Sequence, residues 1–532
     1  MPQDLLYLRR ETQAEPLFHS WYAWTHLIAP ATAARYLTDH YQRILESYVR
    51  GPQFHANALK DPKMVGGPFV DFGGKRVDEV KALIERTRKT AADLFELSFA
   101  LRDLGKHLQE IARGTSLGSV YENVPAPLKG YVELIYDANN SASYRVIEAL
   151  LYGSKYYDEG AQSLLLSITT GDERPFVLST PRVGSDNAFS WQVPFSSPKV
   201  DQLFELASVP RTWEEISSII GPMNGNEALV RTFFTTEAPP APAVRFNADG
   251  VRWRYFGHAC VMVETAGTTI LTDPAISYGY DSALARFTFD DLPARIDYVV
   301  ITHNHQDHVM LETLLRLRHR IGTIVLPHSG RSGLHDISLR QALQRIGFAH
   351  IVELDEMETL HFNGGSITGL PFLGEHGDLN IQSKLAHLIR AGKHTMLFAA
   401  DSCGLEPRLY SHIREAIGKV DTLFVGMECE GAPMSWVYGP LMTQPLERSL
   451  DQTRRLNGSN CEQAMSIVDA LGCEEVFVYA LGQEPWLGHV MGIRYTPESP
   501  PIVESDKLIA LCKARGIPAE RLLYQKEAVL TA

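Results

Sequence analysis

The stretch that decides the fold is Thr302-His303-Asn304-His305-Gln306-Asp307-His308, which directly follows the apolar run Tyr298-Val299-Val300-Ile301. Four side chains that can bind a metal ion lie within six residues, at the end of a predicted buried strand. Imidazole and carboxylate together suit zinc, iron, manganese or cobalt. In the spacing H-x-H-x-D-H the first two histidines share one side of an extended turn, whereas Asp307 and His308 turn toward a second position. The stretch therefore predicts a dinuclear metal site.

Strands and helices alternate from residue 244 onward, which favours sheets sandwiched between helices and an α/β fold class. A helical pattern covers 463–471. Strand-like runs are predicted at 251–256, 259–263, 268–274, 298–301, 323–326, 367–370, 395–398, 422–425 and 476–479.

A dinuclear site needs more ligands than one turn supplies, and we expect them at the ends of other strands. Asp401 follows the strand at 395–400, and its carboxylate can bridge two cations. Glu375 and His376 follow the strand at 367–372. Because neighbouring residues of an extended segment point to opposite sides, we expect only one of this pair to reach the metal easily.

The N-terminal part, residues 1–236, mixes helical and extended patterns and is predicted to be an α+β domain. The pattern turns extended at 163–168 and again at 176–178. One apolar helix stripe, which is either core or a dimer seam, consists of Leu94, Leu97, Leu101, Leu104, Leu108 and Ile111.

A proline-rich segment marks the domain boundary. Residues 237–243 hold three prolines, which favour extended, stiff backbone without ladder hydrogen bonds. We therefore expect an N-terminal domain at 1–236, a linker at 237–243 and a catalytic domain at 244–532.

Composition excludes several classes of function. The net charge is −13, with 63 acidic against 50 basic residues, which argues against a nucleic-acid partner. The first ten residues lack a signal-peptide pattern, and no run approaches the roughly 18 apolar residues of a membrane helix. The six cysteines include no C-x-x-C pair, so we expect reduced thiols and a cytoplasmic location, with no membrane partner.

Residues 244–532 resemble the metallo-β-lactamase superfamily, which implies an αββα sandwich. The resemblance is carried by Gly257-His258-Ala259, Leu271-Thr272-Asp273-Pro274, the 303–308 motif and Ala400-Asp401-Ser402. Hydrolases of this superfamily normally have a histidine after the strand at 367–372 and a final histidine near the C-terminal strand. Here Ala480 stands at the final position, and we expect His489 downstream to be a surface histidine rather than a ligand.

With its extra N-terminal domain and the segment Gly482-Gln483-Glu484-Pro485-Trp486, the whole chain resembles a narrower group. This group is the diiron β-hydroxylases of nonribosomal peptide assembly lines, of the type that acts on carrier-bound L-p-aminophenylalanine in chloramphenicol biosynthesis. His376 is the rival of Glu375 as a ligand, and Glu375 and Asp401 are the candidate catalytic residues. The metal ligands that the resemblance implies are His303, His305, Asp307, His308, Glu375 and Asp401.

The resemblance implies an O2-dependent diiron monooxygenase, an oxidoreductase of antibiotic biosynthesis. A carboxylate in place of an imidazole adds negative charge and hard oxygen donors, which favours the higher oxidation states of iron. One fewer protein ligand leaves an open position for O2, the co-substrate. Two electrons must come from an external donor such as a reductase or ferredoxin, because no glycine-rich flavin or nicotinamide loop is found.

The expected partner is a nonribosomal peptide synthetase carrier domain with a phosphopantetheine-tethered aminoacyl substrate, and a homodimer is also expected. Carrier domains tend to be acidic, so a basic face would steer their encounter. Acidic residues interrupt this basic stretch, so the alternative to a docking face is a solvent-exposed helix face without a partner. The candidate docking residues are Lys75, Arg76, Lys81, Arg86, Arg88 and Lys89.

Several residues outside the ligand set have either a structural or a functional interpretation. Asp273 is expected to anchor a turn, and His258 to support the site or the fold. A loop after the strand at 422–425 either lines an aromatic substrate pocket, hydrogen-bonds ligands, or is ordinary packing. Its candidates are Glu428, Glu430, Trp436 and Tyr438.

Two other functions compete with the oxygenase. A hydrolase of the same fold would cleave a thioester, lactone or phosphoester through a metal-bound hydroxide. A binding protein with a decayed site is the third hypothesis, and the six intact ligand candidates argue against it. Glu375 together with Ala480 favours the oxygenase over the hydrolase.

Overall fold

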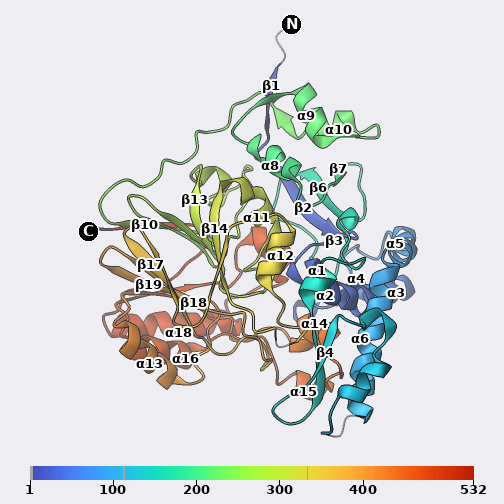
Figure 1. The fold of residues 1–532 in the computed structure, drawn as a ribbon. Helices are drawn as coiled ribbons and strands as arrows, with labels where there is room; N and C mark the ends of the chain where they lie inside the picture. Colours follow the sequence, from blue (N-terminus) through green and yellow to red (C-terminus); the bar gives the residue numbers. More distant parts are fainter. Residues whose placement is uncertain (1–3, 112–113, 332, 532) are drawn as a thin grey trace.

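The computed structural model of the protein describes residues 4–111, 114–331 and 333–531. Within these residues the C-terminal part stacks two seven-stranded sheets face to face, with helices on both outer surfaces (Figure 1). The αββα arrangement expected from the sequence is therefore confirmed. No helix in the described part of the chain combines the length and the apolar character needed to cross a membrane.

The first sheet has the order β15-β14-β13-β12-β11-β10-β23. The strands β12 to β15 run parallel, whereas β10, β11 and β12 pair antiparallel, as do β10 and β23. The strand bounds are β10 (Val251–Gly257), β11 (Cys260–Glu264), β12 (Thr269–Thr272), β13 (Ile296–Val300), β14 (Ile321–Pro327), β15 (Ile351–Leu354) and β23 (Lys526–Leu530).

The second sheet has the order β16-β17-β18-β19-β20-β21-β22. Its antiparallel half runs from β16 to β19, and β19 to β22 are parallel neighbours. The strand bounds are β16 (Thr359–Phe362), β17 (Gly365–Leu370), β18 (Ala386–Ala391), β19 (His394–Phe398), β20 (Thr422–Gly426), β21 (Glu475–Tyr479) and β22 (Ala519–Arg521).

The space between the sheets is filled by aromatic side chains. The Phe424 ring stacks on Phe398 at a centroid distance of 4.7 Å and on Phe477 at 5.2 Å, and Trp253 from the first sheet meets it edge-on at 5.3 Å. Helices bury the outer faces, so the central strands are apolar on both sides and read as continuous hydrophobic runs. These helices are α11 (Leu311–Leu317) and α12 (Leu339–Arg345) on the first sheet, and α13 (Pro407–Ile417), α16 (Cys461–Leu471) and α18 (Pro500–Ala514) on the second.

The N-terminal part is built from small sheets and short helices. The four-stranded sheet β3-β2-β6-β7 is its largest sheet within the described residues, and β8-β1-β9 and the hairpin β4-β5 complete it. The strands are β1 (Leu5–Leu8), β2 (Thr12–Phe18), β3 (Trp21–Tyr22), β4 (Val132–Tyr136), β5 (Ala142–Val146), β6 (Gln162–Ile168), β7 (Ala188–Gln192), β8 (Arg211–Thr212) and β9 (Phe234–Thr235). The α-helices are α1 (Thr25–Ile28), α2 (Pro30–Arg35), α3 (Gln42–Arg50), α4 (Pro52–Ala58), α5 (Val77–Thr90), α6 (Ala92–Ile111), α7 (Glu148–Leu151), α8 (Pro198–Glu205), α9 (Trp213–Ile220) and α10 (Glu227–Arg231).

The leucine stripe of α6 is core. Its five leucines are buried, and only Ile111 at the helix end is exposed. The helix packs against α2 and α5 of the same chain. The stripe is therefore covered within the protein, which excludes it as a dimer seam.

One predicted strand is wrong. Phe176–Leu178 forms a loop and turn, because its backbone bonds to the short helix α17 (Gly488–Met491) instead of a neighbouring strand. The N–H of Val177 donates to the carbonyl of His489 at 2.8 Å. The N–H of Thr180 donates to the carbonyl of Phe176 at 3.0 Å. Through the hydrogen bond to His489, this loop of the N-terminal part contacts the C-terminal part.

The two parts of the chain share one hydrophobic cluster and a buried charge network. Glu312 on α11 accepts hydrogen bonds from the hydroxyls of Tyr22 at 2.8 Å and Tyr278 at 2.6 Å, and from Arg174 at 3.0 Å. Arg174 also lies 3.3 Å from Glu15 on β2. A buried charge network of this kind fixes how two surfaces fit together, because each unpaired member would be costly.

Glu312→Ala tests this network. The variant leaves Arg174 and two tyrosine hydroxyls without their main acceptor, so we expect a loss of about 3–5 kcal/mol in the free energy of unfolding. Urea unfolding followed by tryptophan fluorescence measures it. Asp93→Ala, which breaks an exposed ion pair with Lys155, is the control and should change the midpoint little. Equal shifts in both variants would contradict the structural role of Glu312.

Candidate metal centre

The loop that carries the first four candidate ligands begins directly after β13. Asp273, which follows the neighbouring parallel strand β12 and is fully buried, accepts hydrogen bonds from Thr302. The Thr302 N–H donates to Asp273 Oδ1 at 2.8 Å and its hydroxyl donates to Oδ2 at 2.6 Å. Asp273 therefore anchors the turn beneath the site, as expected from the sequence.

His308 presents one nitrogen to the site. Its Nδ1 lies 2.8 Å from Asp273 Oδ2, so in the neutral ring Nδ1 carries the proton and Nε2 is the atom that can bind a metal. The Nε2 atom lies 3.1 Å from Asp401 Oδ2 and 3.6 Å from Asp307 Oδ2. His258 Nε2 lies 3.0 Å from the same Asp307 oxygen.

His303 and His305 form the other half of the site. The His303 Nε2 atom lies 3.5 Å from Glu375 Oε2 and 3.7 Å from Asp401 Oδ2, between the two carboxylates. The Nδ1 atom of His305 contacts Glu375, and its Nε2 lies 2.7 Å from the hydroxyl of Tyr438. Tyr438 ends the short helix α14 (Met434–Tyr438), so this tyrosine orients the ring of His305.

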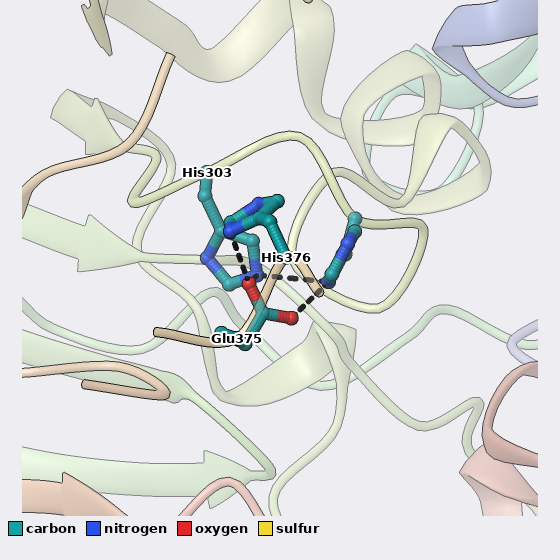
Figure 2. Close-up of side chains that lie close together, drawn as sticks. His303, Glu375 and His376 are labelled. Carbon is teal, nitrogen blue, oxygen red and sulfur yellow. Dashed lines mark hydrogen bonds and ion pairs between the residues drawn. The ribbon is translucent and has the colours of Figure 1, made fainter. Parts of the chain in front are cut away.

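Glu375 and His376 lie on the same side, which contradicts the expectation that only one of them reaches the metal site. The reason is the backbone of Glu375, whose φ of 71° breaks the alternation of an extended segment. The Nδ1 atom of His376 lies 2.9 Å from Glu375 Oε2, and its ring lies 4.7 Å from that of His305. Figure 2 shows the Glu375 carboxylate directed at the rings of His303 and His376.

Asp401 joins the two halves. It follows β19 and Ala400, whose φ of 47° turns the chain, and its Oδ2 approaches both His303 and His308. Its Oδ1 is buried without a hydrogen-bond partner in the described residues. Asp401 therefore has the position of a bridging ligand.

The donor set fits a pair of metal ions. Potential ligand atoms gather in three overlapping groups: His303, His305, Glu375 and His376; His258, Asp307 and His308; and His303, His308 and Asp401. Some polar atoms of these residues are buried with no hydrogen-bond partner among the described residues, which is costly unless a cation binds them. They include His376 Nε2 and Asp401 Oδ1.

The electrostatics agree with a cation site. Burial alone would raise the pKa of Asp307, but the rings of His308 and His258 outweigh burial and hold that pKa well below its usual value. Burial likewise opposes the charged form of Glu375, and the rings of His305, His376 and His303 lower its pKa. Both carboxylates are therefore stabilised as anions, the form that binds metal.

A cavity of about 440 Å³ opens beside these ligands. Its polar end holds His305, Asp307, Glu375, Asp401 and Glu428, and its apolar wall includes Phe176, Trp436 and Met491. The N-terminal part contributes His40, residues 65–68, Phe176 and Leu178. Sequence reasoning missed this contribution, because no motif marks a wall that forms only when distant segments meet.

The late segment supplies no ligand. Ala480 donates its N–H to the carbonyl of His258 at 3.0 Å, so an alanine methyl group stands beside the metal loops. His489 is fully buried, which corrects the expectation of a surface position. Its ring packs 6.0 Å from that of Tyr22, and its Nε2 lies 3.9 Å from Glu312 Oε2. His489 belongs to none of the ligand groups of the described residues.

Fold and site together define a dinuclear metalloprotein of the β-lactamase superfamily, and residues 268–478 match the beta-lactamase superfamily domain. Residues 7–239 match the diiron non-heme beta-hydroxylase N-terminal domain. The chain is 44% identical, over 97% of its length and 98% of the relative's, to the 4-amino-L-phenylalanyl-[CmlP-peptidyl-carrier-protein] 3-hydroxylase of Streptomyces venezuelae. The chain belongs to the diiron non-heme β-hydroxylases.

Solved structures agree with this assignment. The crystal structure of CmlA, a diiron beta-hydroxylase from Streptomyces venezuelae, superposes with a TM-score of 0.93 at 42% identity, over 99% of this chain and 100% of that chain. A structure of a CmlA variant gives 0.91 with the same coverage. The protein is therefore an oxidoreductase, a monooxygenase with a dinuclear iron site, and the oxygenase reading is confirmed over the hydrolase.

Asp273→Asn tests how the loop is anchored. Asparagine has one acceptor oxygen, whereas Asp273 uses Oδ1 for the Thr302 N–H and Oδ2 for the Thr302 hydroxyl and His308 Nδ1. The variant must lose part of this set, so we expect the affinity for one metal ion to fall roughly 10- to 100-fold. Iron retained against a series of chelator concentrations measures the affinity. His489→Ala, a buried histidine outside the ligand groups, should keep its iron. Native iron retention in Asp273→Asn would refute the anchoring role.

Proposed function

We propose that this protein hydroxylates the β-carbon of an aromatic amino acid while a peptidyl carrier domain holds it as a phosphopantetheine thioester. L-4-aminophenylalanine is the first candidate substrate, in a pathway to an antibiotic of the chloramphenicol type. The observation that carries this proposal is the amphiphilic cavity, whose carboxylate-rich end lies at the metal ligands and whose apolar wall suits an aryl ring. The activity of the 44% identical relative, a 3-hydroxylase of a carrier-bound 4-amino-L-phenylalanyl group, supports the same chemistry.

The proposed iron ligands are the six that the sequence predicts. When bound, the iron pair supplies the O2 chemistry by which one oxygen atom enters the β C–H bond and the other leaves as water, with two electrons and two protons from outside the chain. The three carboxylates offset the positive charge, and Asp401 holds the two positions close together. His376 lies in the same group of potential ligands as Glu375, so it could bind the metal in place of Glu375 or beside it. The proposed ligands are His303, His305, Asp307, His308, Glu375 and Asp401, each of which belongs to a group that could hold a metal ion.

The residues around the site hold the ligands and exclude water. Asp273 and Tyr438 each engage the outward nitrogen of a histidine ring, which keeps the other nitrogen directed at the metal. Phe176 and Trp436 line the cavity from opposite parts of the chain, so a bound aryl ring would displace solvent from both.

Carrier docking is proposed on the face of α5. Three of its basic residues are already paired, Arg76 with Glu79, Lys81 with Asp78 and Arg88 with Glu46. Lys75, Arg86 and Lys89 form no ion pair within the described residues and remain available to an acidic partner. Residues 65–68, in the chain segment that precedes α5, line the cavity, which supports docking on this part of the chain.

The electron donor, the homodimer and the domain boundaries stay predictions. We propose a small reductase or ferredoxin as the donor. The homodimer rests on the family resemblance, since α6 packs internally. We propose boundaries at 1–236 and 244–532, which agree with the absence of helix or strand at 238–247 within the described residues.

Turnover under ¹⁸O2 tests the proposed function. Carrier protein loaded with L-4-aminophenylalanine is mixed with the iron-loaded protein and a chemical reductant, and the released amino acid is analysed by mass spectrometry. We expect one ¹⁸O atom per product, at the β-carbon, and none with the free amino acid. Thioester hydrolysis without oxygen incorporation would overturn the proposal.

A further inference from the structure

Glu428 is an acidic side chain of the cavity that the metal site does not use. It follows β20 by two residues and lines the cavity together with Asp307, Glu375 and Asp401. Its backbone carbonyl accepts from Gly458 at 2.8 Å. Its carboxylate forms no hydrogen bond or ion pair with any described residue, although the side chain is half-buried.

The surroundings of Glu428 disfavour its charged form and offer its carboxylate no cationic partner within the described part of the chain. Burial and the nearby carboxylates of Asp401 and Asp307 raise the pKa of Glu428 well above its usual value. Among the described residues that line the cavity, Arg455 is the one permanently cationic side chain. That guanidinium is engaged elsewhere, since its Nε donates to the carbonyl of Gly431 at 2.8 Å and its Nη1 to Gln452 at 3.0 Å. A cation brought in by a ligand would therefore find an unpaired partner.

An aminoacyl thioester brings such a cation. Its α-ammonium is bonded to the carbon next to the β-carbon, so whatever holds the ammonium also sets the distance from the β-carbon to the metal ligands. With the ammonium at Glu428, the aryl ring would pack against apolar residues that line the same cavity, among them Phe176, Trp436 and Met491. One contact thus places both the reacting carbon and the ring.

We propose that Glu428 is the binding subsite for the α-ammonium group of the tethered amino acid. It selects aminoacyl over simple acyl groups and positions the β-carbon at the metal centre. This inference rests on the proposed function and deepens it, since it assigns the recognition of the substrate's charge to one side chain.

Equilibrium binding to the iron-loaded protein under anaerobic conditions tests the subsite. Three acyl groups are attached to a carrier protein through an amide analogue of the thioester: 4-aminophenylalanyl, 3-(4-aminophenyl)propionyl, which lacks the α-amine, and phenylalanyl, which lacks the ring amine. We expect the native protein to bind the desamino carrier roughly 10- to 100-fold more weakly than the 4-aminophenylalanyl carrier.

The Glu428→Gln variant should lose that discrimination. It should bind the 4-aminophenylalanyl carrier as weakly as the native protein binds the desamino carrier, with no further loss for the desamino group. Glu462→Gln is the control, because Glu462 is an exposed acid on α16 that does not line the cavity, and it should keep the native ratio. Iron content and the absorption spectrum of Glu428→Gln should be native, which separates the effect from damage to the metal site.

Two results would overturn the subsite. One is native discrimination against the desamino carrier in Glu428→Gln. The other is a variant that loses discrimination only between the phenylalanyl and 4-aminophenylalanyl carriers, which would assign Glu428 to the ring amine. If the native protein fails to hydroxylate any carrier-bound aryl amino acid, the proposed function itself fails, and the subsite with it.

Discussion

The metal centre depends on one buried carboxylate, that of Asp273. It receives the N–H and hydroxyl of Thr302 at the start of the ligand loop and the Nδ1 of His308 at its end. A loop held at both ends by charge-assisted hydrogen bonds keeps few conformations, so the ligands between them are positioned before any metal arrives. The parallel pairing of β12 with β13 brings Asp273 there, and the rest of the sandwich keeps those strands in register.

The two parts of the chain contribute different components of the site. The C-terminal sandwich carries every proposed ligand, and the N-terminal part closes the cavity. The two are also joined at the ligand loop, where Thr25 donates to the side chain of Asn304 at 2.5 Å, and at α14, where Tyr36 donates to the carbonyl of Val437 at 2.5 Å. A displacement of the N-terminal part would therefore reach both the wall of the cavity and the residues that orient His305.

Much of the fold and site was predictable from local patterns. The ligand loop and Asp401 each follow a strand whose apolar run is unmistakable, because helices bury both faces of the sheets. The orientation of Glu375 was not predictable, since the positive φ that turns it toward the histidines leaves no signature at a non-glycine residue. Phe176–Leu178 has strand-like composition, yet its backbone partners lie over 300 residues away, at His489. Short edge strands such as β16 and β22 were also not predicted, because half-exposed strands carry a weaker apolar signal.

Three histidines and three carboxylates around one bridging position are the central claim of this account. Imidazole-rich sites suit zinc, whereas added carboxylates favour iron that changes oxidation state. Mössbauer spectroscopy of protein loaded with ⁵⁷Fe, with iron and zinc content measured on the same sample, tests the claim most directly. The account predicts about two irons per chain in one spin-coupled pair with a diamagnetic ground state. One iron per chain, two uncoupled irons, or two zinc ions that iron does not displace would contradict it.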